Sequence, residues 1–263
     1  MTGGHWNAHA RQWSLIASPL RPHRDDVGNL RQAIDTNSGL HLLLGLTPEY
    51  AALFNRLVAV DCSAAMIAAL WPAQAPGKMA IQADWLGLPL GDASFHSCIG
   101  DGSLNVFSFP SQYPRFFDQL ARVLRPGGRI ALRVFVRPDA GEACDAVCAS
   151  ALQARITSFH AFKWRLAMAI AHETGDSNVR VAAIREAFMR RLPERKALAV
   201  ASGWSVESID TIDAYAKAGA SYSFPTLAHL RRAVPDYLET VDLKYGRYEL
   251  AERCPMLVLQ RTR

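Results

Sequence analysis

The sequence lacks several features that would place it in a membrane or outside the cell. It has no run of about 18 apolar residues that could span a bilayer, and its opening residues, MTGGHWNAHARQW, have no apolar signal-peptide core. Its cysteines are few and scattered, which excludes a disulfide framework. They are Cys62, Cys98, Cys144, Cys148 and Cys254. We therefore expect a protein of a reducing compartment, the cytoplasm, with no membrane partner.

Strong charge asymmetry and metal-ligand clusters are also missing. The net charge is only +5, and the basic residues do not interleave with aromatic ones along a recognisable nucleic-acid module. His5 and His9 have ligand spacing on a helix but no third ligand, and Cys144 and Cys148 have no soft partners nearby. We expect no nucleic-acid groove and no metal site.

What the sequence does contain is an alternation of strand and helix patterns over residues 40–136. The expected strands are residues 40–46, 57–60, 80–83, 94–100 and 129–136. Between them, Thr47-Pro48-Glu49 predicts a capped helix start, and residues 64–71 and 113–124 predict helices. Such βα alternation predicts an α/β fold with a doubly wound parallel sheet.

The flanking regions follow other patterns. Residues 5–36 are expected to be helical with a break at 19–22, where two prolines stand. From about residue 139 the pattern changes to helices without strands, expected at 142–159, 161–172, 177–191 and 205–217. A helix over 225–233 and strands over 237–245 and 255–261 complete the chain. We expect an N-terminal helical cap (1–39), a core (40–138 and 223–263) and a helical insertion after the fifth strand that acts as a lid (139–222).

Acids follow three successive strands, where a ligand of an open α/β sheet would bind. Asp61 can accept hydrogen bonds from ribose hydroxyls. Asp84 can accept from an exocyclic amine while Trp85 offers a flat face to a purine, and Asp101 suits an ammonium or sulfonium group. Gly45 allows the backbone to approach a ligand closely. One such aspartate is often only a turn or cap residue, but three in succession favour a ligand site.

These residues resemble the class I S-adenosylmethionine-dependent methyltransferase family. The resemblance rests on LLLGLT, VDCSAAM, QADWLGLPLGDASFHSCIGDGSLNVF, ARVLRPGGRIALRVF and the ending YELAERCPMLVLQR. It implies a Rossmann-like seven-stranded sheet of order 3-2-1-4-5-7-6 and S-adenosyl-L-methionine as cofactor. The positions that it matches to the cofactor site are Gly45, Leu46 and Thr47 (turn), Asp61 (ribose), Cys62 and Met66 (adenosine), Asp84 and Trp85 (adenine), and Asp101 and Gly102 (methionine).

The sequence departs from this family in its first motif. The usual pattern is acid-x-glycine-x-glycine-x-glycine, whereas residues 41–47 hold Gly45 alone. A bound dinucleotide would need that glycine-rich turn for its pyrophosphate, and Glu49 would repel it, so a dehydrogenase is disfavoured more strongly.

The resemblance implies in-line methyl transfer to a small molecule, which needs alignment and exclusion of water more than a catalytic group. We expect Arg21 to bind the cofactor carboxylate. Asn105 and Tyr113 are candidates to face the acceptor, and His160 is either part of a pocket or of the helical core. The alternatives are a non-catalytic cofactor-binding or scaffold protein, supported by the single glycine, and, ranked lowest, methylation of nucleic acid or protein. The sequence leaves the acceptor atom and the oligomeric state open.

Overall fold

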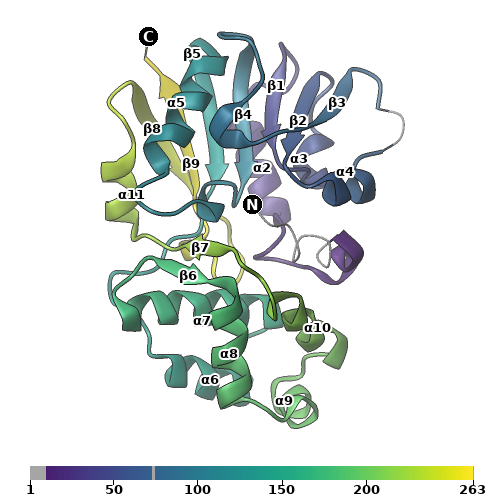
Figure 1. The fold of residues 1–263 in the computed structure, drawn as a ribbon, viewed down its shortest axis with the longest axis vertical. Coiled ribbons are helices and arrows are strands. Elements are labelled where there is room, and N and C mark those ends of the chain that lie inside the picture. The colour runs from purple at the N-terminus through teal and green to yellow at the C-terminus, as the bar shows by residue number, and fades with distance from the viewer. Residues whose placement is uncertain (1–9, 73–74, 263) are drawn as a thin grey trace.

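The structure is a computed structural model that describes residues 10–72 and 75–262. Its main feature is a seven-stranded sheet in the order β3-β2-β1-β4-β5-β9-β8 (Figure 1). The strands are β1 (His41–Leu44), β2 (Leu57–Asp61), β3 (Lys78–Gln82), β4 (Phe95–Asp101), β5 (Leu124–Arg133), β8 (Leu238–Lys244) and β9 (Met256–Arg261). This confirms the predicted fold and strand order. Only the numbers differ, because two short strands, β6 and β7, precede the last pair.

Five neighbouring strands of the sheet, β3, β2, β1, β4 and β5, run parallel, because crossover connections join them. Leu42, Leu43 and Leu44 of β1 are almost fully buried and pair with β2 on one side and β4 on the other. This burial on both faces is what a continuous apolar run predicts. The carboxyl ends of the parallel strands therefore meet at one edge of the sheet, where the sequence places its acids.

Helices cover both faces of the sheet. The helices α2 (Arg24–Ala33), α3 (Pro48–Ala51) and α4 (Ala64–Leu70) pack on one face. The helices α5 (Tyr113–Val123) and α11 (Leu227–Ala233) pack on the other, where Phe116, Phe117 and Leu120 are fully buried. Three one-turn helices accompany them, namely η2 (Trp85–Gly87), η3 (Leu104–Val106) and η5 (Ala251–Arg253).

A largely helical insertion follows β5 and lies beyond the carboxyl ends of the strands (Figure 1). It has its own hydrophobic core. Its elements are α6 (Cys144–Leu152), α7 (Phe159–Thr174), β6 (Asn178–Arg180), α8 (Val181–Arg191), α9 (Arg195–Ser202), α10 (Val206–Asp210), η4 (Thr211–Tyr215) and β7 (Ser221–Ser223). The prediction of helices without strands was wrong here, because β6 and β7 pair as a small antiparallel sheet. The helix α9 was not predicted.

Several local predictions also need correction. Before β1, the described residues 10–11 are helical, and a one-turn helix, η1 (Trp13–Leu15), and α2 follow, so no continuous helix runs up to the break. Thr47 does not cap α3 through its side chain, and α3 is a single turn. Residues 125–128, which separate the predicted helix 113–124 from the predicted strand 129–136, lie inside β5, where the pairing with β4 shifts register. His5 and His9 lie outside the described residues, and the proposed domain boundaries stay a prediction.

None of the helices in residues 10–72 and 75–262 is long and apolar enough to cross a membrane.

Candidate active site

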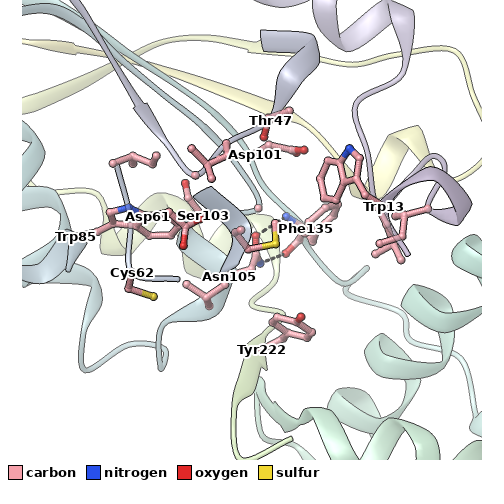
Figure 2. Close-up of a pocket in the computed structure, with 18 of the residues that line it drawn as sticks. Trp13, Thr47, Asp61, Cys62, Trp85, Asp101, Ser103, Asn105, Phe135 and Tyr222 are labelled. Carbon is pink, nitrogen blue, oxygen red and sulfur yellow. Dashed lines mark hydrogen bonds between the residues drawn. The ribbon is translucent and has the colours of Figure 1, made fainter. Parts of the chain in front are cut away.

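A cavity opens at the carboxyl edge of the sheet, between the strand ends and the insertion. It encloses about 1100 Å³ of space, its opening to solvent included. Figure 2 shows Asp61, Cys62 and Trp85 on one side of it, Trp13 and Phe135 on the other, and Tyr222 on the side of the insertion. Its lining residues are Trp13, Ile16, Leu20, Leu44, Gly45, Leu46, Thr47, Asp61, Cys62, Met66, Trp85, Asp101, Gly102, Ser103, Asn105, Val106, Phe135, Trp164, Tyr215 and Tyr222. Most of the residues predicted for the cofactor are therefore together in one cavity.

Asp61 ends β2 with its carboxylate at the cavity wall. Its Oδ1 atom accepts a hydrogen bond from the backbone N–H of Ser63 at 2.7 Å, whereas Oδ2 has no partner among the described residues. Burial raises the pKa of Asp61 to about 6, and the Ser63 bond opposes that rise only in part. A half-buried carboxylate with an oxygen to spare can accept hydrogen bonds from the hydroxyls of a ligand.

Trp85 is fixed as one wall of the same end of the cavity. Its Nε1 donates to the carbonyl oxygen of Val60 at 2.7 Å, so its orientation is set by the backbone of the strand that ends in Asp61. Cys62 and Met66 complete this end. Partial burial raises the pKa of the Cys62 thiol, so this sulfur stays protonated at neutral pH and could contact a ligand as a small uncharged group. The result is a flat, largely apolar slot beside a carboxylate.

Gly45 allows the backbone to turn between β1 and α3. Its φ is +91°, and a Cβ added there would lie 3.9 Å from Cζ2 of Trp85. We expect Gly45→Ala to weaken binding of S-adenosylhomocysteine about tenfold and to lower the free energy of unfolding by about 1–2 kcal/mol, because an L-residue is strained at this φ. The new methyl group also narrows the slot. Calorimetry and urea denaturation measure the two effects.

The matched control for that change is Gly28→Ala. Gly28 lies in α2, a Cβ there meets nothing within 4 Å, and its φ is not positive. This variant should bind the ligand as the parent does and should be slightly more stable. Equal binding by the Gly45 variant would show that the turn backbone does not approach the ligand.

Two of the predicted residues do not line the cavity. Asp84 accepts a hydrogen bond from the backbone N–H of Leu86 at 2.9 Å, which makes it the N-cap of η2. The Arg21 guanidinium pairs with Glu49, its Nε lying 2.8 Å from Oε1, and stacks on Trp13 at 5.1 Å. Their roles as ligands of the adenine and of the cofactor carboxylate stay predictions, and neither side chain is free in this structure.

Asp101 is held by a buried ion network that the sequence did not reveal. Its Oδ1 lies 2.6 Å from Nε of Arg133, whose side chain is fully buried. Nη1 of Arg133 also approaches Asp26 at 3.5 Å and Tyr248 at 3.3 Å. Burial raises the pKa of both aspartates, and Arg133 opposes that rise. The single cation thus lies between two carboxylates, and the charge of Asp101 is largely compensated.

Five aromatic residues form much of the rest of the cavity wall, and they were not predicted as a unit. Trp13 comes from the N-terminal segment, Phe135 follows β5, and Trp164, Tyr215 and Tyr222 come from the insertion. These residues lie far apart in the sequence, so no local pattern groups them.

The side chains expected to face an acceptor have structural roles instead. Nδ2 of Asn105 donates to the carbonyl oxygens of Phe135 and Ser223, at 2.8 and 2.6 Å. The Tyr113 hydroxyl lies 2.9 Å from Oγ of Ser223 and is not at the cavity wall. His160 is buried in the insertion, with Nε2 2.8 Å from the carbonyl oxygen of Leu15. Asn105, which lines the cavity, therefore links the chain after β5 to β7. Both of its N–H donors are used in these bonds, and its Oδ1 accepts from the backbone N–H of Phe135 at 2.9 Å.

Comparison with known proteins finds a family match over part of the chain. Residues 44–132 match the family model described as a methyltransferase domain. No curated protein sequence matches the chain.

Solved structures share the fold at low sequence identity. A putative zinc-dependent alcohol dehydrogenase from Rhodobacter sphaeroides has a TM-score of 0.59 at 12% identity, covering 97% of this chain and 98% of its own. A SAM-dependent methyltransferase from Methanosarcina mazei has 0.52 at 13%, covering 89% and 96%. The N-methyltransferase NodS from Bradyrhizobium japonicum, in complex with S-adenosylhomocysteine, has 0.53 at 12%, covering 99% and 100%.

The strand order and the strand-end cavity define a Rossmann-like α/β fold with a ligand-sized cavity at the carboxyl ends of its parallel strands. With the matched domain, they confirm the resemblance of this chain to the class I S-adenosylmethionine-dependent methyltransferases. The cofactor of that family is S-adenosyl-L-methionine, as predicted.

Proposed function

We propose that this protein transfers a methyl group from S-adenosylmethionine to a small molecule by in-line displacement. The observation that carries the proposal is the cavity itself, in which the predicted adenosine-binding residues and an aromatic chamber face one another. A cofactor in the slot beside Asp61 and Trp85 would extend toward Asp101 and Gly102. Its reactive end would then lie next to the aromatic residues. A small acceptor fits because the chamber is covered by the insertion.

The residues present suit a reaction that needs little acid–base chemistry. The titratable side chains at the wall are Asp61, Cys62, Asp101, Tyr215 and Tyr222. The carboxylate of Asp101 is paired with Arg133, and burial raises the pKa of the tyrosines and the thiol. Because a sulfonium methyl is already activated, alignment of the acceptor and exclusion of water are the contributions that this apolar chamber can make.

Calorimetry with S-adenosylmethionine and S-adenosylhomocysteine tests the cofactor half of the proposal. We expect saturable binding of both ligands at one site per chain. If neither ligand binds at about 1 mM, where even a weak ligand of about −4 kcal/mol would be half-bound, the enzyme proposal fails.

A non-catalytic cofactor-binding or scaffold protein is the second candidate, and the single glycine of the first motif favours it. It predicts that no acceptor is methylated even though the cofactor is bound. Mass spectrometry of the protein incubated with S-adenosylmethionine and an added acceptor separates the two candidates. Even slow formation of S-adenosylhomocysteine supports the enzyme, and none supports the non-catalytic protein.

A further inference from the structure

We propose that the methyl acceptor is an uncharged aromatic molecule and that Lys163, outside the cavity, excludes cationic acceptors. This inference rests on the proposed function, because it names the substrate class for the same cavity. It is carried by the arrangement of aromatic rings and cations around the acceptor chamber.

The chamber is built from aromatic rings that contact one another edge to face. The centroid of Trp164 lies 5.1 Å from that of Phe135, at an interplanar angle of 70°, and 5.3 Å from that of Tyr222, at 76°. Trp13 and Tyr215 extend this wall, and Ile16 and Leu20 add aliphatic surface. A flat aromatic ligand gains more from such a wall than an aliphatic one does, since it can contact both ring faces and ring edges.

An aromatic chamber could also hold a cation, but here three of the rings already carry one. Arg21 stands over Trp13 at 5.1 Å and Arg133 over Phe135 at 5.2 Å. Nζ of Lys163 stands over Tyr215 at 5.3 Å. None of these three residues lines the cavity, so the cations contact the rings from outside the chamber. A cationic ligand on the same rings would gain less from them, and it would be repelled by any of these cations whose charge is not compensated.

Lys163 differs from the two arginines because its charge is not compensated. Arg21 pairs with Glu49, and Arg133 pairs with Asp101 and Asp26. Lys163 is fully buried in α7 and donates to Oγ1 of Thr211 at 3.0 Å, and no carboxylate of the described residues forms an ion pair with it. Its field therefore reaches the chamber with little opposition.

The carboxylates of the cavity wall disfavour an anionic acceptor. The carboxylates of Asp61 and Asp101 both belong to the cavity wall, and Asp61 has no cationic partner among the described residues. A negative ligand would gain from Lys163 and be repelled by these two groups. The combination selects a molecule without net charge.

Two probes of equal size separate these cases. The first is 1-naphthol, which is neutral, and the second is N-methylquinolinium, a permanent cation with the same number of non-hydrogen atoms. Calorimetry is done with and without saturating S-adenosylhomocysteine at about pH 6, where Lys163 holds its proton because its burial lowers its pKa only to about 7. We expect 1-naphthol to bind at least about tenfold more tightly than the cation.

Substituting Lys163 tests the assigned role. In Lys163→Met the cation should bind within about threefold of 1-naphthol, while binding of 1-naphthol itself stays as in the parent. The variant should fold, because Oγ1 of Thr211 keeps its hydrogen bond to the carbonyl oxygen of Ser208 at 2.7 Å. The control is Lys196→Met, which removes the same charge from an exposed position of the insertion and should leave the preference unchanged.

Each outcome decides something. Equal or tighter binding of the cation to the parent protein overturns the inference, as does an unchanged preference in folded Lys163→Met. If S-adenosylhomocysteine does not bind but 1-naphthol is still preferred in its absence, the proposed function fails and the neutral aromatic chamber stands.

Discussion

Asp61→Ala is expected to abolish measurable binding of S-adenosylhomocysteine, which means a loss of at least about a hundredfold. Each hydrogen bond from a ribose hydroxyl to a carboxylate contributes about 1.5–3 kcal/mol, and two of them together exceed the roughly 2.7 kcal/mol that a hundredfold change requires. The side chain has an oxygen available, since only Oδ1 is used by Ser63. Calorimetry on the folded variant measures the loss, and binding equal to that of the parent would remove Asp61 from the site.

Two checks separate this role from a general effect of charge. Asp92→Ala removes an acid of which 75% is exposed and whose partner is Arg122, and it should leave binding unchanged.

Because the pKa of Asp61 is raised to about 6, the unliganded protein takes up a proton there as the pH falls from 7 to 5. A protonated carboxyl accepts less strongly, so binding should weaken over that interval in the parent protein. Asp61→Asn should bind weakly with no such pH dependence.

The sequence was sufficient for the sheet because its signals are local. The apolar run of β1 and the amphipathic pattern of α5 each occupy one stretch of chain, and their alternation defines a parallel sheet. The strands β6 and β7 have three residues each and pair Val179 with Tyr222, so no local pattern marks them. A strong local signal can also mislead. Residues 47–49 mark the start of a helix, but they do not determine its length, and α3 is a single turn.

The same distinction between local signals and tertiary packing applies to the site. Asp61, Trp85 and Asp101 could be predicted because strand ends share one edge of a parallel sheet. Asp84 and Arg21 were placed by residue type and position. The bond of Asp84 to the Leu86 N–H is the local cap that a strand-end aspartate often makes, whereas the pairing of Arg21 with Glu49 joins residues far apart in the chain. The aromatic wall depends on how the insertion packs against the strand ends, which is tertiary information. Arginine in a strand is ordinarily exposed, so no local pattern indicates that Arg133 lies in the core.

Arg133→Met is expected to lower the free energy of unfolding by about 3–5 kcal/mol, the usual effect of removing one member of a buried charge cluster. The side chain is fully buried between Asp101 and Asp26, and methionine replaces its volume but not its charge. Two buried carboxylates would then face each other without a cation. Urea denaturation at neutral pH measures the change. The control is Arg185→Met, which breaks a half-exposed pair with Asp213 at 2.9 Å and should change stability by no more than about 1 kcal/mol.

The pH dependence of the Arg133 effect identifies its cause. Burial already raises the pKa of Asp26 and of Asp101 while Arg133 opposes the rise, so its removal raises both values further. The native variant then holds more protons than its unfolded chain, and its free energy of unfolding must fall as the pH rises. The loss relative to the parent should therefore be smaller at about pH 5 than at about pH 8. An equal loss of stability at both pH values would mean that Arg133 stabilises the fold through packing. It would also mean that the charge of Asp101 does not depend on Arg133.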